Sequence, residues 1–123
     1  MQVISTAQAP AAIGPYSQAI VAGSMVYTSG QIAIDPATGV VEQGDVRAQT
    51  HRVCRNIRAL LQASGSDIAK VVKTTCFLAD MADFAAFNEI YAQYFTSAPA
   101  RSCVAVKTLP KNVLVEIDTI AEL

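Results

Sequence analysis

The sequence contains few charged side chains, and this scarcity excludes several classes of protein. Charged residues make up 15% of the 123 residues, whereas hydrophobic residues make up 52%. Such a chain is too apolar to remain disordered. It also has few solvated groups with which to cover the surface of a small monomer, and this predicts self-association. The formal net charge of −1 provides no overall attraction for nucleic acid or an anionic membrane, so neither is expected as a partner.

Cysteine and histidine are also scarce, and they follow no metal-binding or disulfide pattern. Cys54, Cys76 and Cys103 are odd in number, widely spaced and in no C-x-x-C pair, so we expect free thiols. His51 is the only histidine, and a lone histidine cannot build a zinc site. The sequence has no Walker loop, no G-x-G-x-x-G motif and no serine nucleophile elbow. No metal or cofactor is expected.

Long hydrophobic runs and a signal peptide are absent as well. No apolar run approaches the roughly 20 residues that span a bilayer, and the first residues lack a charged region followed by an apolar one. We therefore expect a cytoplasmic protein. The length fits one domain of common size, and no linker or repeat interrupts it, so residues 1–123 are expected to form a single domain.

The first third of the chain has the composition of short strands. Tyr16–Val21 and Met25–Ser29 are β-rich runs on either side of Ala22-Gly23-Ser24, which predicts a hairpin. Ile32–Ile34 leads into Asp35–Gly39, where a proline and a glycine predict a turn.

The period changes to that of a helix between Asp45 and Ser64. Asp45 is placed to cap this helix and Gly65 to end it. Its apolar stripe comprises Val46, Thr50, Val53, Ile57, Leu60 and Leu61. Its opposite face carries Arg47, His51, Arg55 and Arg58, which we interpret as a solvated surface.

A strand and a second helix are predicted next. Ile68–Leu78 is rich in valine and threonine and favours a strand, and Asp80 is placed to cap the helix that follows. The stripe of that helix comprises Phe84, Phe87, Asn88, Tyr91 and Phe95. The order strand, helix, strand predicts a right-handed parallel crossover from residues 71–78 to 101–106.

The last two strands carry ionisable groups among apolar ones, and alternation divides them between two faces. In the first strand, one face carries Ser102, Val104 and Val106, and the other carries Arg101, Cys103 and Ala105. In the second, one face carries Val113, Val115 and Ile117, and the other carries Leu114, Glu116, Asp118 and Ile120. If the helices cover the purely apolar face, Arg101, Cys103 and Glu116 emerge together on the open face. Leu114, Ala105 and Ile120 would keep that face apolar enough to pack against another subunit.

Several separated motifs resemble one known family. The C-terminal ones are Pro99-Ala100-Arg101-Ser102-Cys103-Val104, Leu109-Pro110-Lys111 and Val115-Glu116-Ile117. They are similar to the signature of the Rid/YjgF family, the reactive-intermediate (enamine/imine) deaminases. The N-terminal blocks of that family resemble Ile13-Gly14-Pro15-Tyr16-Ser17-Gln18 and Thr28-Ser29-Gly30-Gln31-Ile32, and its second helix resembles Asp83-Phe84-Ala85 through Asn88 and Tyr91. The match spans nearly the whole chain in order.

The resemblance implies a fold, an assembly and an activity. The fold would be α+β and chorismate-mutase-like, with a mixed six-stranded sheet and two helices on one face. The assembly would be a homotrimer with the sheets facing inward and the sites between subunits. The activity would be cofactor-independent hydrolysis of small 2-imino and enamine acids to 2-oxo acids and ammonia. Candidate substrates are 2-aminoacrylate, 2-iminopropanoate and 2-iminobutanoate.

Two residues are expected to be catalytic under this resemblance. Arg101 would bind the substrate carboxylate, because a planar guanidinium pairs with it through two hydrogen bonds. The alternative is an intersubunit salt bridge, for which Asp118 is available. Glu116 would hold and activate water, because a partly apolar cleft raises the pKa of a carboxyl group. Its alternative role is an ion pair with Lys73 or Lys107.

Five further residues are expected to bind substrate. Tyr16 and Ser29-Gly30 match positions that line the family's cleft, where Tyr16 would cover the substrate and Gly30 would permit close backbone approach. Cys103 matches a cleft position but lacks a histidine partner, so we assign it to substrate contact through its backbone N–H. Asn88 interrupts an apolar stripe and needs a hydrogen-bond partner, for which a loop backbone is the alternative.

Two other classes of function remain open. The basic stripe of the first helix would support an RNA-binding, endoribonuclease-type translation inhibitor. A trimer of the same fold could also act without catalysis, as a ligand-binding regulator or a chaperone.

Overall fold

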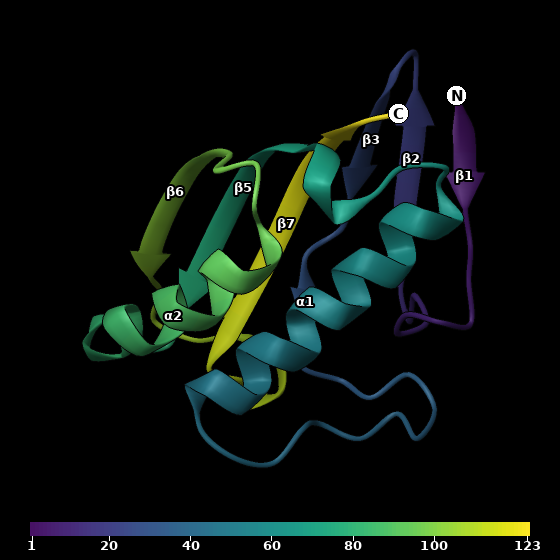
Figure 1. Ribbon diagram of the computed structural model, residues 1–123. Coiled ribbons are helices and arrows are strands. Elements are labelled where there is room, and N and C mark those ends of the chain that lie inside the picture. The colour runs from purple at the N-terminus through teal and green to yellow at the C-terminus, as the bar shows by residue number, and fades with distance from the viewer.

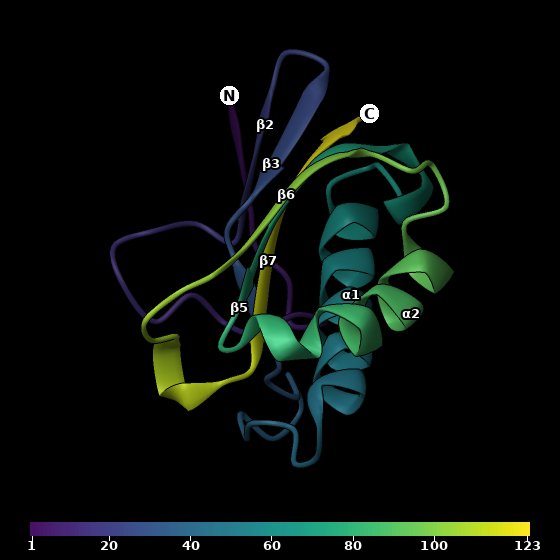
Figure 2. The same cartoon turned by 90° about the vertical axis from the view of Figure 1, so that its left-hand side faces the viewer.

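Two helices cover one face of a mixed β-sheet in the computed structural model, which describes residues 1–123 (Figure 1). The helices are α1 (Val46–Ala63) and α2 (Phe84–Tyr94). The strands are β1 (Gln2–Ile4), β2 (Ala19–Ala22), β3 (Met25–Thr28), β4 (Gln31–Ile32), β5 (Val71–Leu78), β6 (Ala100–Ala105) and β7 (Val115–Glu122). Figure 2 shows α1 and α2 on the same side of the sheet, whereas the other side has only loops and the short 3₁₀ turn Pro110–Asn112.

The sheet has seven strands, so the prediction of six was wrong by one. Its order is β1-β2-β3-β7-β5-β6, and β4 pairs with β7 outside that path. Both β3 and β4 lie antiparallel to β7, with Tyr27 opposite Ile120 and Gln31 opposite Ile117. The chain leaves the ladder at Ser29 and Gly30 between them. Two short strands therefore share one position in the sheet, and the break between them exposes Gly30.

The hairpin and the parallel crossover pair follow the sequence prediction. Strands β2 and β3 pair antiparallel, and Gly23 in their turn has φ of 60°, which favours glycine. Strands β5 and β6 pair parallel with α2 between them in the chain. The strand begins at Val71 rather than Ile68, because Ile68–Lys70 forms a 3₁₀ turn. Asp80 caps a second 3₁₀ turn, Met81–Asp83, which precedes α2.

Helix α1 begins and ends where its sequence predicts. The Asp45 carboxylate accepts a hydrogen bond from the backbone N–H of Ala48 at 3.0 Å, and Gly65 has φ of 84° just beyond the helix. Val53, Ile57 and Leu60 are fully buried against the sheet. The long α1 therefore anchors the core on which the strands rest.

The outer face of α1 differs from the expected solvated stripe. His51 is half-buried, and its Nδ1 lies 3.0 Å from the hydroxyl of Tyr94 on α2. The Arg58 guanidinium lies 4.9 Å from the centre of the same ring, and Arg47 pairs with Glu89 of α2 at 3.0 Å. Arg55 is exposed and follows the prediction. The prediction was wrong for His51 because α2 packs beside this part of α1.

The opposite face of the sheet is open and largely apolar. Its side chains include Val3, Ile20, Tyr27, Ile120, Phe77 and Val104, as the strand register and alternation require. Leu114 instead packs partly against the core, and Ala105 pairs with buried Leu78 on the helix face, so these two predictions were wrong. None of the helices is long and apolar enough to cross a membrane.

Candidate functional site

A cavity of about 420 Å³ opens on the side of the sheet opposite α1 and α2. The loop that contains Pro10–Tyr16 and the 3₁₀ turn Pro110–Asn112 lie on that side, as Figure 2 shows in purple and yellow-green. The predicted site residues Tyr16, Ser29, Gly30 and Glu116 line it together. Its other lining residues include Ile13, Ile32, Ile34 and Lys111. The structure thus brings four of the seven predicted site residues into one apolar cavity with a single carboxylate.

Glu116 and Gly30 lie in direct contact. A Cβ atom added to Gly30 would collide with Oε2 of the Glu116 carboxylate and would lie 3.0 Å from its Cδ. Ile32 of β4 pairs with Glu116 across the ladder, and this pairing aligns the carboxylate with the gap that precedes β4. The missing side chain at position 30 therefore makes the space that the carboxylate occupies.

The surroundings of Glu116 raise its pKa above the ordinary value of a glutamate. Burial is the larger cause, because a desolvated carboxylate is less stable, and the negative charge of Asp118 is the second. Both side chains lie on the open face of β7, two residues apart. Burial also raises the pKa of Asp118, while its hydrogen bond with Thr75 and the charge of Lys73 lower it. Glu116 is therefore able to exchange a proton closer to neutral pH.

A buried amide holds the loop that forms one wall of the cavity. The Gln18 Oε1 accepts from the backbone N–H of Thr6 at 2.7 Å. Its Nε2 donates to the carbonyls of Thr6, Ala9 and Pro10, at 3.0, 3.3 and 2.8 Å. The hydroxyl of Ser29 donates to the carbonyl of Ser17 at 2.6 Å, which fixes the loop to the end of β3. Ser29 thus lines the cavity and also forms a hydrogen bond that stabilises the loop.

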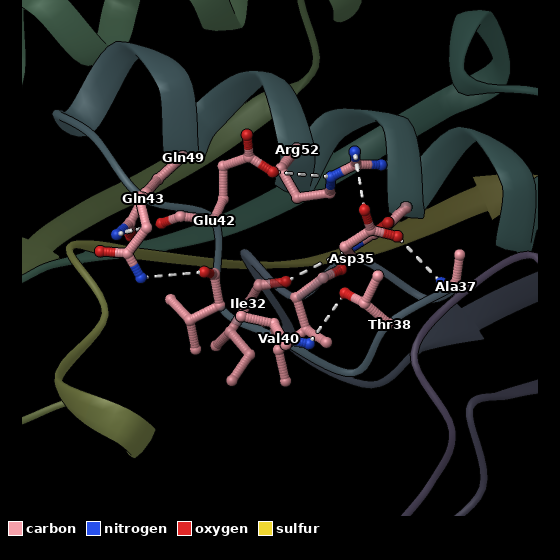
Figure 3. Close-up of polar contacts among 12 residues, drawn as sticks. Ile32, Asp35, Ala37, Thr38, Val40, Glu42, Gln43, Gln49 and Arg52 are labelled. Atoms are coloured by element: carbon pink, nitrogen blue, oxygen red, sulfur yellow. Dashed lines mark hydrogen bonds and ion pairs between the residues drawn. The ribbon is translucent and has the colours of Figure 1, made fainter.

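The loop between β4 and α1, residues 33–45, is held against α1 by polar side chains (Figure 3). Arg52 lies 3.4 Å from the Glu42 carboxylate and 3.8 Å from that of Asp35. The buried Gln49 donates to the Glu42 carbonyl at 3.4 Å, and its Oε1 accepts from the backbone N–H of Leu114 at 2.8 Å. Gln49 therefore connects this loop to the segment that leads directly into β7 and Glu116.

Gln18 and Gln49 are residues that the sequence reasoning missed, together with Asn56. Asn56 is fully buried and donates to the carbonyls of Ile32 and Ile34, at 3.3 and 2.8 Å. Each of these amides is a buried polar group, and such groups are hydrogen-bonded in folded proteins. The signal that could have found Gln49 and Asn56 is their position on the apolar face of α1.

Arg101 and Cys103 lie on the helix face of the sheet, so the prediction that they share a face with Glu116 was wrong. In the parallel register Arg101 is opposite buried Thr74, and Cys103 is opposite buried Cys76. Paired residues on neighbouring strands point to the same face. Glu116 pairs with Phe77 on the other face. The predicted division of β6 into two sets of side chains was correct. The pairing with β5, however, places the set that contains Arg101 and Cys103 on the helix face rather than on the open face.

Arg101 is held by side chains of α2. Its Nη1 donates to Oδ1 of Asn88 at 2.8 Å. Its guanidinium carbon lies 4.9 Å from the ring centre of Tyr91 and 5.4 Å from that of Phe84. The partner of Asn88 is therefore a guanidinium and not the loop backbone that was the alternative. Neither Arg101 nor Glu116 forms a salt bridge within the chain.

The three cysteines are free thiols, as expected. Burial raises the pKa of Cys76 to about 12, and it also raises that of Cys54. Burial raises the pKa of the half-buried Cys103, although the Arg101 charge acts in the opposite direction. A thiol with a raised pKa is mostly protonated near neutral pH, which disfavours nucleophilic attack by sulfur.

Comparisons with known proteins find relatives over nearly the whole chain. A family model described as Endoribonuclease L-PSP matches residues 6–123. A RutC family protein of Synechocystis is 56% identical over 126 residues, which cover 100% of this chain and 97% of the relative. The 2-iminobutanoate/2-iminopropanoate deaminase of Salmonella typhimurium is 49% identical over 124 residues, which cover 98% of this chain and 96% of that enzyme.

A solved structure extends the similarity to the fold. The crystal structure of Escherichia coli TdcF with bound serine matches with a TM-score of 0.95 and 43% sequence identity, over 100% of this chain and 99% of that one. The two chains thus share one fold along their whole length. The chain belongs to the Rid/YjgF family, the group that the L-PSP family model describes.

Proposed function

We propose that the protein hydrolyses small 2-imino and enamine acids to 2-oxo acids and ammonia. The observation that carries the proposal is the Glu116 carboxylate, held against Gly30 in a mainly apolar cavity where its pKa is raised. The Salmonella relative is named as a deaminase of 2-iminobutanoate and 2-iminopropanoate, and TdcF binds serine, which is also a small carboxylic acid.

The reaction needs one water and a group that moves its protons. An enamine first becomes the imine by moving one proton from its nitrogen to its β-carbon. Glu116 then takes a proton from water as the water oxygen bonds to the imine carbon, and it returns this proton to the nitrogen, which has received the former C=N electron pair. In the tetrahedral intermediate a second proton moves from the new hydroxyl group to the nitrogen, the C=O bond forms, and the C–N bond breaks to release ammonia and the 2-oxo acid. A carboxyl group with a raised pKa suits both steps, because it is a stronger base than an ordinary glutamate and can also return the proton. Tyr16 covers the cavity beside it.

The substrate carboxylate is assigned to Arg101, which requires two copies of the chain. Arg101 and Cys103 lie on the helix face at β6, the last strand of the sheet, whereas Glu116 lies on the open face. A second copy packed against the open apolar face would bring its β6 edge to the cavity of the first. This supports the homotrimer with sites between subunits that the family resemblance implies, and it gives the exposed Val104 and Tyr27 a partner surface.

RNA binding is the second candidate function, because the family model carries the description endoribonuclease. The basic face of α1 is the feature that would support it. Arg47 pairs with Glu89, and His51 contacts the hydroxyl of Tyr94. Arg55 and Arg58 are exposed and have no salt bridge, although Arg58 also lies over the Tyr94 ring. The deaminase proposal accounts for the Glu116 carboxylate held against Gly30 in the cavity, which RNA binding through α1 does not use, and is therefore preferred.

The direct test is the rate at which freshly generated 2-aminoacrylate disappears. This enamine also hydrolyses unaided, so the measurement is the excess rate, with ammonia release as a second readout. We expect Glu116→Gln to lower turnover roughly 10²- to 10⁴-fold, because it keeps the size but removes the proton acceptor. Cys103→Ala should stay within about tenfold, since only a weak thiol contact is lost. An inactive Cys103→Ala with an active Glu116→Gln would indicate covalent thiol catalysis instead.

A further inference from the structure

The charge of Arg101 has no carboxylate partner within the chain. The salt bridges of the molecule involve Arg47 and Arg52 only. Arg101 makes one hydrogen bond, to the amide oxygen of Asn88, although a guanidinium has five N–H donors. The neutral amide of Asn88 therefore holds the Arg101 cation, and most N–H donors of the guanidinium remain available.

Aromatic rings fix the plane of the guanidinium. The Arg101 carbon Cζ lies 4.9 Å from the Tyr91 ring centre and 5.4 Å from that of Phe84. The hydroxyl of Tyr91 lies 2.7 Å from that of Thr74, which is fully buried, so the ring itself is fixed. Ring faces attract a cation without neutralising it. Arg101 is thus oriented by three α2 side chains, none of which carries a negative charge.

We propose that Asn88 is a positioning residue that orients Arg101 through an uncharged acceptor and thereby keeps the positive charge available for a ligand carboxylate. This inference rests on the proposed function, in which Arg101 receives the substrate carboxylate. It revises the prediction that Asn88 touches substrate, because Asn88 acts through Arg101. An aspartate at this position would have the same shape and an oxygen in the same place, but it would form an ion pair with Arg101 and compete with the ligand.

The Asn88→Asp and Asn88→Ala variants separate positioning from a merely structural bond. The probe is 2-oxobutanoate, a stable 2-oxo acid, and its binding is measured by calorimetry beside thermal unfolding. We expect Asn88→Asp to weaken binding by at least about tenfold, the equivalent of one charge-assisted hydrogen bond, without lowering the melting temperature. Asn88→Ala should weaken binding less, because the charge stays free while its orientation is lost.

Gln93→Glu is the matched control, because it adds the same charge to an exposed position of α2. It should bind 2-oxobutanoate like the wild type. A structural role for Asn88 predicts the opposite ranking, with Asn88→Ala the weaker binder and Asn88→Asp restored by its ion pair. That ranking would overturn the inference, and so would an unfolded Asn88→Asp, since the exchange preserves size and acceptor.

The outcome for the proposed function is separate. The deaminase proposal alone is refuted if the wild type binds 2-oxobutanoate and the Asn88 variants bind it in the expected order, but the wild type does not accelerate the loss of 2-aminoacrylate. The inference about Asn88 alone is refuted if the wild type hydrolyses 2-aminoacrylate and Asn88→Asp has a normal KM and normal binding. Absence of 2-oxobutanoate binding to the wild type at millimolar concentration would overturn the inference.

Discussion

Residue 30 shows how the absence of a side chain can make room for a carboxylate. The Glu116 carboxylate occupies the volume that a Cβ on residue 30 would fill. The backbone at Gly30 does not have the positive φ that would itself require glycine. The constraint at this position is therefore the neighbouring carboxylate and not the turn.

Gly30→Ala should consequently damage activity much more than stability. The methyl group displaces the flexible end of Glu116, and a displacement of about 1 Å at a reacting group costs on the order of 10²-fold in rate. Turnover and the melting temperature are measured together. In a Glu116→Gln background the same exchange should have little additional effect, because it acts through Glu116. Fully additive losses in the double variant would contradict this mechanism.

Asp118 should set the acid limit of activity. In the proposed reaction Glu116 acts as a carboxylate, so activity should fall as the pH drops through its pKa, and a raised pKa makes that loss begin at a higher pH. Asp118→Asn removes a negative charge that raises the pKa of Glu116. Lys111, the cation that lines the cavity, is unchanged in this variant. The acid limb of the kcat/KM profile should therefore move to lower pH. An unchanged limb would mean that Asp118 does not influence Glu116 in the assembled protein.

At the scale of elements, the sequence predicted both helices and most strands because their signals are local. The cap at Asp45, the glycine at position 65 and the helical period between them are all contained within one segment. The face of Arg101 depends instead on pairing between β5 and β6, which lie apart in the sequence. Alternation fixes which residues share a face along one strand, but only the register between strands decides which face each set joins.

In the candidate site, too, the sequence identified the residues that belong to local motifs but not the contacts that depend on packing between elements. Tyr16, Ser29, Gly30 and Glu116 were identified through motifs and lie around one cavity. The partner of Asn88 could not be predicted, because it required knowing that Arg101 points toward α2. His51 was misplaced for a similar reason, since contact with Tyr94 arises from the packing of two separate helices.

The outer face of α1 provides the test between deamination and RNA binding. Arg55→Glu together with Arg58→Glu should leave hydrolysis of 2-aminoacrylate unchanged, because neither residue lines the cavity. Loss of the Arg58 contact with Tyr94 should cost only about 0.5–1 kcal/mol of stability. A protein that binds RNA through this face would lose affinity and show a flatter salt dependence. Loss of deaminase activity in a folded double variant would show that α1 contributes to the site.

At the scale of the whole molecule, the open sheet face and the divided site have one explanation. The sheet face lined by Tyr27, Val104 and Ile120 needs an apolar cover that the two helices, on the other side, do not provide. The same association would join the Arg101 half of the site to the Glu116 half. Light scattering at micromolar concentration should give the mass of a trimer, and a monomer mass would refute the shared site together with the assembly.

Mixed assemblies give the most direct test of a shared site. Arg101→Ala and Glu116→Gln should each be inactive alone. In a trimer whose sites combine Arg101 of one copy with Glu116 of the next, every mixed trimer contains one site with both native residues. Unfolding and refolding a 1:1 mixture should therefore restore about a quarter of the wild-type activity, since three-quarters of random trimers are mixed. A mixture that remains as inactive as its components, in trimers shown to have exchanged subunits, would place Arg101 and Glu116 in separate roles.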